Sequence, residues 1–257
     1  MHDNKCVYRL THCVKHGDFE QKGLIINGKP LWLRCPMCQK EKDEEDKKED
    51  KRSEAYINRL KYQRIFGQWL PKAFDYPLES FEVLDVDMGN AFWDANEFVI
   101  NFSRYRQEGL GLFLTGRAGT GKTKIACGIL KKFYPEVVGC YVTLCGLGDL
   151  VRQTWGRSKD EITRYTETEL IRAVYETPLL VLDEIGTINK DHDGELLFKV
   201  IDTRYSNLLP TICISNLSLA GLTNLYGERL SRRIEERNRI IVFDWMPWHQ
   251  RQKTMNE

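Results

Sequence analysis

Short apolar runs alternate with segments whose apolar residues recur every three or four positions from about residue 63 to the end of the chain. Short continuous apolar runs are typical of buried parallel strands, and the longer spacing is typical of helices packed on a sheet. The pattern predicts strands at 110–115, 139–144, 178–183, 210–216 and 239–243, and helices at 91–108, 124–133, 147–155, 160–176, 194–208, 219–226 and 228–237. This alternation predicts an α/β domain with a mostly parallel sheet.

The first 64 residues follow a different pattern. Residues 1–39 hold four of the eight cysteines and three of the five histidines, whereas residues 40–64 are dominated by charges of both signs. Opposite charges at helical spacing form stabilising pairs, so we expect a charged helical linker there, with disorder of its most charged part as the alternative. The sequence thus predicts three parts: a module at 1–39, a linker at 40–64 and the α/β domain at 65–257.

Composition restricts the surroundings in which the chain works. Apolar residues make up 42% of its 257 residues, enough for a core, and the formal net charge is only +1. Contact with DNA would therefore need a local basic patch rather than a global field. No apolar run is long enough to cross a bilayer, and residues 1–5 lack a signal-peptide pattern, so we expect a cytoplasmic protein without a membrane partner and with reduced cysteines.

A glycine-rich turn separates the predicted strand at 110–115 from the helix at 124–133. Its residues are Gly116, Arg117, Ala118, Gly119, Thr120, Gly121, Lys122 and Thr123. The glycines let backbone N–H groups point at phosphate oxygens, and the helix N-terminus adds partial positive charge. Lys122 would reach the β- and γ-phosphates, and the Thr123 hydroxyl would ligate Mg²⁺. A plain turn is the alternative, but both flanks favour a site for a nucleotide triphosphate such as ATP.

Acidic and amide side chains follow two later strands. Asp183 and Glu184 end the strand at 178–183, and Asn216 ends the next one. Ligands bind at the carboxyl ends of parallel strands, so Asp183 would hold Mg²⁺ and Glu184 would act as general base on the attacking water. Asn216 would orient that water, or cap the following helix, and both roles stay open.

Two arginines lie four residues apart in the predicted helix at 228–237. Arg229 and Arg233 therefore share a face and are candidates for an arginine finger reaching the γ-phosphate of a neighbouring subunit. The alternative is a solvated basic face balanced by Glu235 and Glu236.

Together these motifs resemble the AAA+ ATPases of the DnaC/DnaI helicase-loader and IstB type, over roughly residues 65–250. The matching segments are the Walker A loop at 116–123, Walker B at 179–186, sensor 1 at 214–216 and the arginine-finger helix at 227–233, with 70–74 and 80–81 similar to the segment before the ATPase core. The resemblance implies an AAA+ P-loop NTPase core, a parallel sheet flanked by helices, that hydrolyses ATP and self-associates when ATP is bound. It places the finger best on Arg233 and second on Arg229. For sensor 2, Arg251 is a weak match, and His249 or no residue at all are the alternatives.

The N-terminal module carries two short pairs of metal-ligand type. Cys13 and His16 form a C-x-x-H pair, Cys35 and Cys38 form a C-x-x-C pair, and 18 residues separate the two. This spacing predicts a tetrahedral structural Zn²⁺ site, with a hairpin at 24–33 between the pairs, turning at 27–28. So short a module needs the metal for its folding energy.

Several alternatives for the cysteines and histidines remain. Cys6 and His12 are lower-ranked ligands, and four unrelated reduced side chains are the simplest alternative. Similar zinc modules precede the ATPase domain in some loader-type proteins, where they look like partner-docking elements. The remaining cysteines, expected to be small buried hydrophobes, are Cys127, Cys140, Cys145 and Cys213.

A tryptophan flanked by cations lies after the second predicted strand. Trp155 could stack on a base of single-stranded DNA while Arg152, Arg157 and Lys159 contact phosphates. The family resemblance points to the same region. Packing of Trp155 in the core is the alternative.

The resemblance therefore favours an ATP-dependent loader that places a hexameric replicative DNA helicase on single-stranded DNA during replication initiation. Two alternatives stay open. One is an IstB-like transposition-helper ATPase acting on duplex DNA. The other is a zinc-anchored adaptor whose ATP site is a switch without hydrolysis.

Overall fold

The computed structural model describes residues 6–26, 29–46, 70–133, 137, 139–153, 166–187 and 192–255. The chain divides into two compact units, Met1–Ile57 and Asn58–Glu257, which are described separately below.

A five-stranded sheet forms the centre of the larger unit. All its neighbouring strands are parallel, in the order β5-β6-β7-β4-β8. Its strands are β4 (Gly111–Gly116), β5 (Gly139–Thr143), β6 (Leu179–Ile185), β7 (Thr211–Ser215) and β8 (Asn238–Phe243). The predicted α/β class is confirmed, and each predicted strand is present within a few residues of its expected bounds. Because the strands are parallel, their carboxyl ends meet at one edge.

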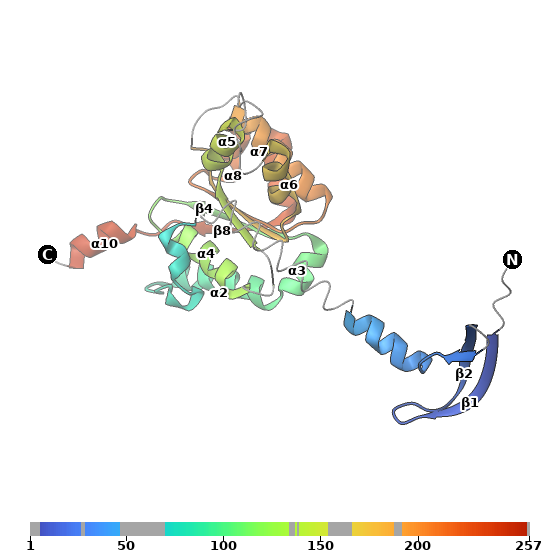
Figure 1. Cartoon of the computed structure of the whole chain (residues 1–257). Coiled ribbons are helices and arrows are strands. Elements are labelled where there is room, and N and C mark those ends of the chain that lie inside the picture. Colours follow the sequence, from blue (N-terminus) through green and yellow to red (C-terminus); the bar gives the residue numbers. More distant parts are fainter. Residues whose placement is uncertain are drawn as a thin grey trace. The chain divides into compact units, whose positions relative to one another are not determined.

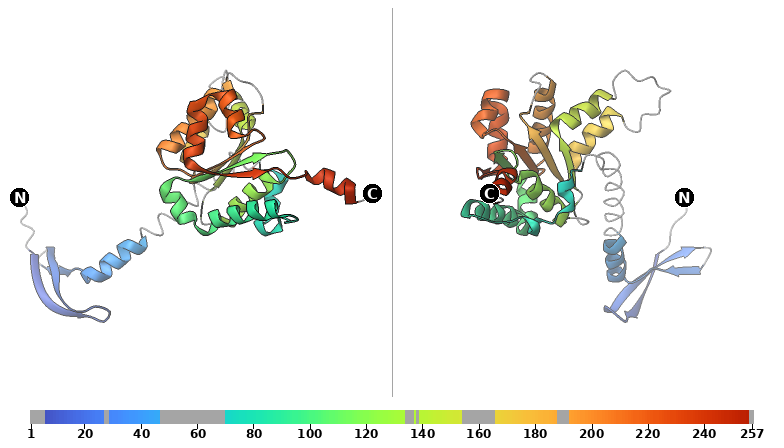
Figure 2. Two further views of the ribbon diagram at one scale, coloured as in Figure 1. Left: turned by 180° about the vertical axis from the view of Figure 1, so that it is seen from behind. Right: turned by 90° about the vertical axis from the view of Figure 1, so that its left-hand side faces the viewer.

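Helices cover both faces of this sheet (Figures 1 and 2). On one face lie α2 (Val86–Ile100), α3 (Phe102–Glu108) and α4 (Lys122–Phe133), with the short 3-10 helices η2 (Lys72–Asp75) and η3 (Leu78–Ser80) packed on α4. The other face carries α5 (Leu144–Gln153), α6 (Glu167–Glu176), α7 (His192–Ser206), α8 (Leu219–Tyr226) and α9 (Glu228–Arg237). The last helix, α10 (Trp248–Met255), follows β8 and projects away from the sheet (Figure 1).

The helix predicted at 91–108 is two helices in the structure. Asp85 begins α2 earlier than expected, because its side chain accepts a hydrogen bond from the Met88 N–H. Asn101 ends α2, and its side-chain amide donates to the Glu97 carbonyl. An asparagine that bonds its own backbone competes with the helix ladder, which explains the break.

A buried arginine ties the helical layer to the sheet. Arg204 of α7 is fully buried, and its guanidinium donates to the carbonyls of Val174, Thr177 and Pro210 and to the Thr211 hydroxyl. These bonds join the end of α6 and the start of β7 to α7.

The smaller unit contains a three-stranded antiparallel sheet in the order β1-β2-β3. Its strands are β1 (Cys6–Cys13), β2 (Gly17–Ile26) and β3 (Lys29–Trp32), and a helix at residues 36–46 follows them. The predicted hairpin is present as β2 and β3, while its turn at 27–28 lies outside the described residues. The helix starts before residue 40, so the second cysteine pair lies at its N-terminal end.

None of the helices in the described part of the chain combines the length and apolar character that crossing a membrane requires.

Candidate functional site

The glycine-rich turn connects the end of β4 to the start of α4. Gly116, Gly119 and Gly121 have φ values of 125°, 75° and 99°, a region that side-chain-bearing residues rarely adopt. Space is also limiting, because a Cβ on Gly116 would lie 2.3 Å from the Phe243 carbonyl oxygen, and one on Gly121 2.7 Å from the Phe81 ring. The turn therefore requires glycine at these positions.

Lys122 points back into this turn. Its side chain is largely buried, and its Nζ donates to the carbonyls of Gly116 and Arg117 at 2.7 and 2.6 Å. Burial lowers the pKa of Lys122 to about 8, while the nearby Asp183 acts in the opposite direction. A cation held inside an amide-lined turn favours an anionic ligand there.

Asp183, at the end of β6, collects three donors. Its Oδ2 accepts from the Thr123 hydroxyl and from the Tyr141 hydroxyl, each at 2.8 Å, and its Oδ1 accepts from the Glu184 N–H at 2.6 Å. The structure thus brings together Thr123 and Asp183, which the sequence predicted as Mg²⁺ ligands. Both supply oxygen, the ligand atom that Mg²⁺ prefers.

Tyr141 was not anticipated from the sequence. It lies on β5, the strand beside β6, and it is buried. Burial raises the pKa of the Tyr141 hydroxyl, so the group stays protonated and donates its proton to Asp183. The apolar pattern of residues 139–143 predicted the strand, but not a hydroxyl aimed at the acid of its neighbour.

Glu184 has a backbone conformation that is rare for a residue other than glycine. Its φ is 61°, and the pairing of β6 with β7 is irregular between Leu182 and Ile185. A left-handed conformation costs a residue with a side chain about 1–3 kcal/mol, and such residues cluster at functional sites. The Glu184 side chain is exposed, and Asn216 is exposed just beyond β7, the strand next to β6. Both predicted residues therefore lie at the carboxyl edge of the sheet.

The segment after β8 lines the turn from a second side. The Arg117 N–H donates to the Phe243 carbonyl, the Trp245 indole N–H to the Thr120 carbonyl and the Trp248 N–H to the Gly119 carbonyl, each at 3.0 Å. A hollow of about 370 Å³ lies beside the turn, with aromatic side chains and Lys124 in its wall: Tyr76, Phe81, Trp245 and Trp248. The sequence did not predict this hollow, because its walls come from residues that lie far apart in the chain.

The two sensor-2 candidates differ in position. His249 is exposed beside Gly119, since a Cβ there would lie 3.4 Å from its Nδ1. Arg251 donates to the Met246 carbonyl at 2.8 Å and lies 3.5 Å from the Asp85 carboxylate.

The two candidate finger arginines lie on α9, against α7. Arg233 forms an ion pair with Asp202, and its guanidinium lies 4.9 Å from the Tyr205 ring centroid. Arg229 is exposed and lies 4.6 Å from the Phe198 ring centroid. Arg229 is thus held less firmly than Arg233, although the family resemblance ranks it second.

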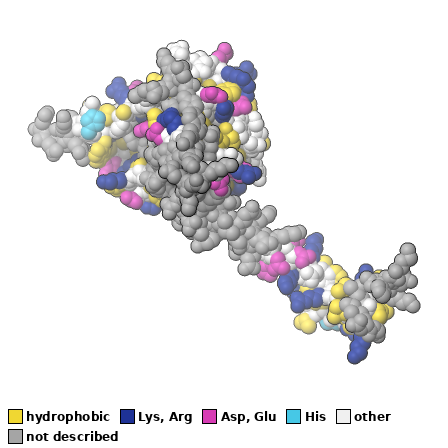
Figure 3. Space-filling model, turned by 45° about the horizontal axis from the view of Figure 1, so that its top comes forward, with side chains coloured by type: hydrophobic (Ala, Val, Ile, Leu, Met, Phe, Trp, Pro, Cys, Tyr) yellow, Lys and Arg dark blue, Asp and Glu magenta, His cyan; other side chains and the backbone are white. Residues whose placement is uncertain are grey.

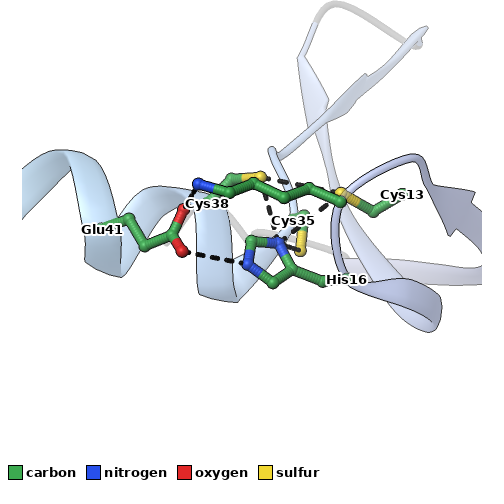
Figure 4. Close-up of polar contacts among 6 residues, drawn as sticks. Cys13, His16, Cys35, Cys38 and Glu41 are labelled. Atoms are coloured by element: carbon green, nitrogen blue, oxygen red, sulfur yellow. Dashed lines mark hydrogen bonds and ion pairs between the residues drawn. The ribbon is translucent and has the colours of Figure 1, made fainter.

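The four predicted metal ligands meet at one point in the smaller unit (Figure 4). The ligand atoms of Cys13, His16, Cys35 and Cys38 all lie within 4.8 Å of one another. The Cys13 and Cys38 sulfurs are 3.6 Å apart, and His16 Nδ1 lies 3.4–3.8 Å from the three sulfurs. Usual zinc bond lengths give tetrahedral ligands about 3.8 Å apart for two sulfurs and about 3.6 Å for sulfur and nitrogen.

The spacing of these atoms therefore fits zinc. Hydrogen bonding to the Lys15 backbone lowers the pKa of Cys13 to about 6, which favours the thiolate that a metal requires. The lower-ranked His12 instead pairs with Asp18 at 2.6 Å. The Cys6 side chain lies outside the described residues.

The other cysteines belong to the larger unit. Cys127, Cys140 and Cys213 are buried as expected, and Cys145 is half-buried. Burial raises the pKa of Cys127 and of Cys213 to about 12, so both thiols stay neutral.

The predicted DNA-binding region around Trp155 lies mostly outside the described residues. Trp155, Arg157 and Lys159 lie outside the described residues, and the exposed Arg152 pairs with Asp149 at 2.6 Å. On the face drawn in Figure 3, described basic and acidic side chains are intermingled, in keeping with the small net charge.

The parallel sheet, the glycine turn after β4 and the acid at the end of β6 define an AAA+ P-loop nucleotide-binding protein. The family model of the IstB-like ATP binding protein matches residues 100–237, slightly more than half of the sequence. The chain belongs to this family.

Individual relatives agree with the family. The chain is 25% identical over 197 residues to "Replicative helicase loader DnaC" of Escherichia coli (strain K12), covering 75% of this chain and 77% of that protein. A crystal structure of the DnaC helicase loader is similar at 29% identity with a TM-score of 0.59, covering 68% of this chain and all of that one. A structure of DnaI, 21% identical with a TM-score of 0.56, covers 66% of this chain and 92% of that one and supports the fold alone.

Proposed function

We propose that this protein is an ATP-dependent loader that places a hexameric replicative DNA helicase on single-stranded DNA during replication initiation. The contact of Thr123 with Asp183 next to the glycine turn carries the proposal, because it brings together the two side chains expected to hold Mg²⁺ in a chain similar to DnaC.

The triphosphate would follow the N–H groups of the turn, with Lys122 at its β- and γ-phosphates. The aromatic hollow beside Gly119 and Thr120 is suited to the adenine base. Thr123 and Asp183 would hold Mg²⁺, which neutralises charge on the phosphates. Glu184 would take a proton from the attacking water, and Asn216 would orient that water.

A neighbouring subunit would complete this site. Arg233 or Arg229 of one copy would reach the γ-phosphate held by the next, so ATP would favour self-association. Arg233 would first have to leave Asp202, whereas Arg229, among the described residues, would give up its contact with the Phe198 ring. Loss of the γ-phosphate on hydrolysis removes contacts made only in the assembled state, which would release the loader.

The zinc unit would bind the helicase. Tyr8, Leu10 and Leu31 are exposed, and the strand register puts them on one face of the small sheet. We name these three residues the apolar face. Apolar side chains gathered on one exposed face are typical of protein interaction sites. The region of Arg152, Trp155 and Arg157 would contact single-stranded DNA.

The test is a pull-down with the replicative hexameric helicase of the same host and ATP, followed by an assay of helicase transfer to a single-stranded DNA circle. The double variant Tyr8→Ser/Leu10→Ser should lose capture, whereas Val14→Ser, at an exposed apolar residue outside the apolar face, should keep it. Absence of capture and transfer by the unaltered protein would contradict the loader function.

A second candidate function follows from the family match itself. An IstB-like transposition helper would bind duplex DNA in the presence of ATP and would not transfer the helicase. Measuring ATP-dependent affinity for duplex and single-stranded DNA of equal length separates the two functions. A third candidate, an adaptor with an ATP switch, would bind ATP without turnover.

A further inference from the structure

The metal cluster continues beyond its four ligands to an acidic side chain. Glu41 lies on the helix at 36–46, three residues after Cys38. Its Oε1 is 3.2 Å from His16 Nε2, and its Oε2 is 2.6 Å from Lys15 Nζ (Figure 4). Glu41, on the helix that contains Cys38, therefore contacts Lys15 and His16 in the turn after β1.

The two nitrogens of the His16 ring face different groups. Nδ1 faces the three sulfurs and Nε2 faces Glu41. A histidine that ligates zinc through Nδ1 must be neutral and must carry its proton on Nε2. A carboxylate oxygen can only accept, so the Nε2–H donates to it, and that bond selects this tautomer.

We propose that Glu41 is a positioning residue of the zinc site. Its carboxylate holds His16 in the ring orientation and tautomer that present Nδ1 to the metal, and it makes this nitrogen a stronger ligand. The inference rests on the proposed zinc binding and deepens it. Outer-shell carboxylates of this kind typically change metal affinity about 10- to 100-fold when removed.

Lys15 has a separate, smaller role. Zinc with three thiolates carries one net negative charge, and Glu41 adds another close by. The Lys15 ammonium offsets that second charge. Because the Lys15 and Glu41 side chains are 67% and 45% exposed, their pairing itself adds little stability. Orientation of His16, rather than the ion pair, is therefore the main effect of Glu41.

The experiment measures zinc affinity of the full-length chain by competition with a chromogenic chelator, together with the rate of zinc loss to excess chelator. Glu41→Ala should weaken zinc about 10- to 100-fold and speed its loss. Glu41→Gln, which keeps an accepting oxygen without the charge, should fall between Glu41→Ala and the unaltered chain. The control, Glu44→Ala, removes an exposed carboxylate from the same helix and should stay within about twofold.

Two further measurements distinguish a loss of His16 positioning from a general disruption of the smaller unit. Cobalt-substituted protein should keep the absorption of a three-sulfur, one-nitrogen tetrahedral site in Glu41→Ala, since the ligands are unchanged. Nitrogen-15 NMR of His16 should show Nε2 protonated in the unaltered protein. In Glu41→Ala, the preference for this tautomer should be weaker.

The outcomes are distinguishable. Equal zinc affinity in Glu41→Ala and Glu44→Ala, with one zinc bound per chain in both, overturns the role of Glu41 but leaves the zinc site. Equal weakening in both variants also overturns it, because the helix rather than the carboxylate would then matter. If the unaltered chain retains no zinc, the zinc site fails and this inference fails with it, while the ATP site is unaffected.

Discussion

The glycine turn of the larger unit and the Cys/His cluster of the smaller unit hold their key side chains in opposite ways. Thr123 and Asp183 are brought together by buried parallel strands and the helix packed on them. In the described part of the smaller unit, only Gly23 and Cys35 are buried. We therefore expect the fold to position the side chains of the first site, and a bound metal to stabilise the fold around the second.

Removal of zinc should give the largest effect and separate the two regions most clearly. Structural zinc contributes about 10–16 kcal/mol in small zinc domains, so Cys35→Ser or a strong chelator should unfold the strands of the smaller unit. The affinity for ATP should change less than about twofold, since the two regions belong to separate compact units. Hydrogen exchange followed by mass spectrometry measures both units at once. Continued protection of residues 6–26 without zinc would contradict the comparison.

Within the larger unit, Glu184→Gln should slow ATP hydrolysis without destabilising the fold. Loss of the general base should lower the ATPase rate by about 100- to 10,000-fold, while ATP affinity and the melting temperature stay nearly constant. Glutamine keeps the size of the side chain at this left-handed position. The matched control is Glu235→Gln, an exposed acid on α9. Turnover that persists in Glu184→Gln would show that another group activates the water.

Arg204→Met should affect the scaffold and not the zinc site. The substitution leaves several buried carbonyls without their donor, which we expect to cost about 2–4 kcal/mol of unfolding free energy. Arg172→Met removes only an exposed ion pair with Glu176 and should cost less than about 1 kcal/mol. Denaturant unfolding of the zinc-loaded protein gives both values. Similar stability of the two variants would mean that the Arg204 bonds are not needed to join α6, α7 and β7.

Tyr141→Phe should have the smallest effect. It removes one hydroxyl donor from Asp183, which keeps those from Thr123 and Glu184. A hydrogen bond to a charged group is worth about 1.5–3 kcal/mol. Because Asp183 keeps two other donors, we expect the lower end of this range, so the Mg²⁺ concentration for half-maximal turnover should rise roughly tenfold, with little change in maximal rate. An unchanged Mg²⁺ requirement would show that Tyr141 packs without orienting Asp183.

The sequence predicted those features that depend on residues close together along the chain. The apolar runs predicted each strand of the larger sheet, and the C-x-x-H and C-x-x-C pairs predicted four side chains that the structure brings together. Strand β1 was missed, although the alternation of apolar Tyr8 and Leu10 with polar Arg9 and Thr11 was an available signal.

Contacts between residues that lie far apart in the sequence were not predictable in this way. Tyr141 meets Asp183 only because β5 lies beside β6, and Glu41 meets His16 from 25 positions away. The aromatic hollow likewise joins residues on either side of η3, the glycine turn and the segment after β8. Such contacts depend on strand order and packing, which spacing along one sequence does not specify.

The most direct test of the central claim, a magnesium-dependent ATP site at the glycine turn, is titration calorimetry with ATP and Mg²⁺ on the unaltered chain and on Lys122→Ala. We expect heat from one ATP per chain, dependent on Mg²⁺, and its near disappearance in Lys122→Ala. No heat from the unaltered chain, or equal heat from both proteins, would contradict it.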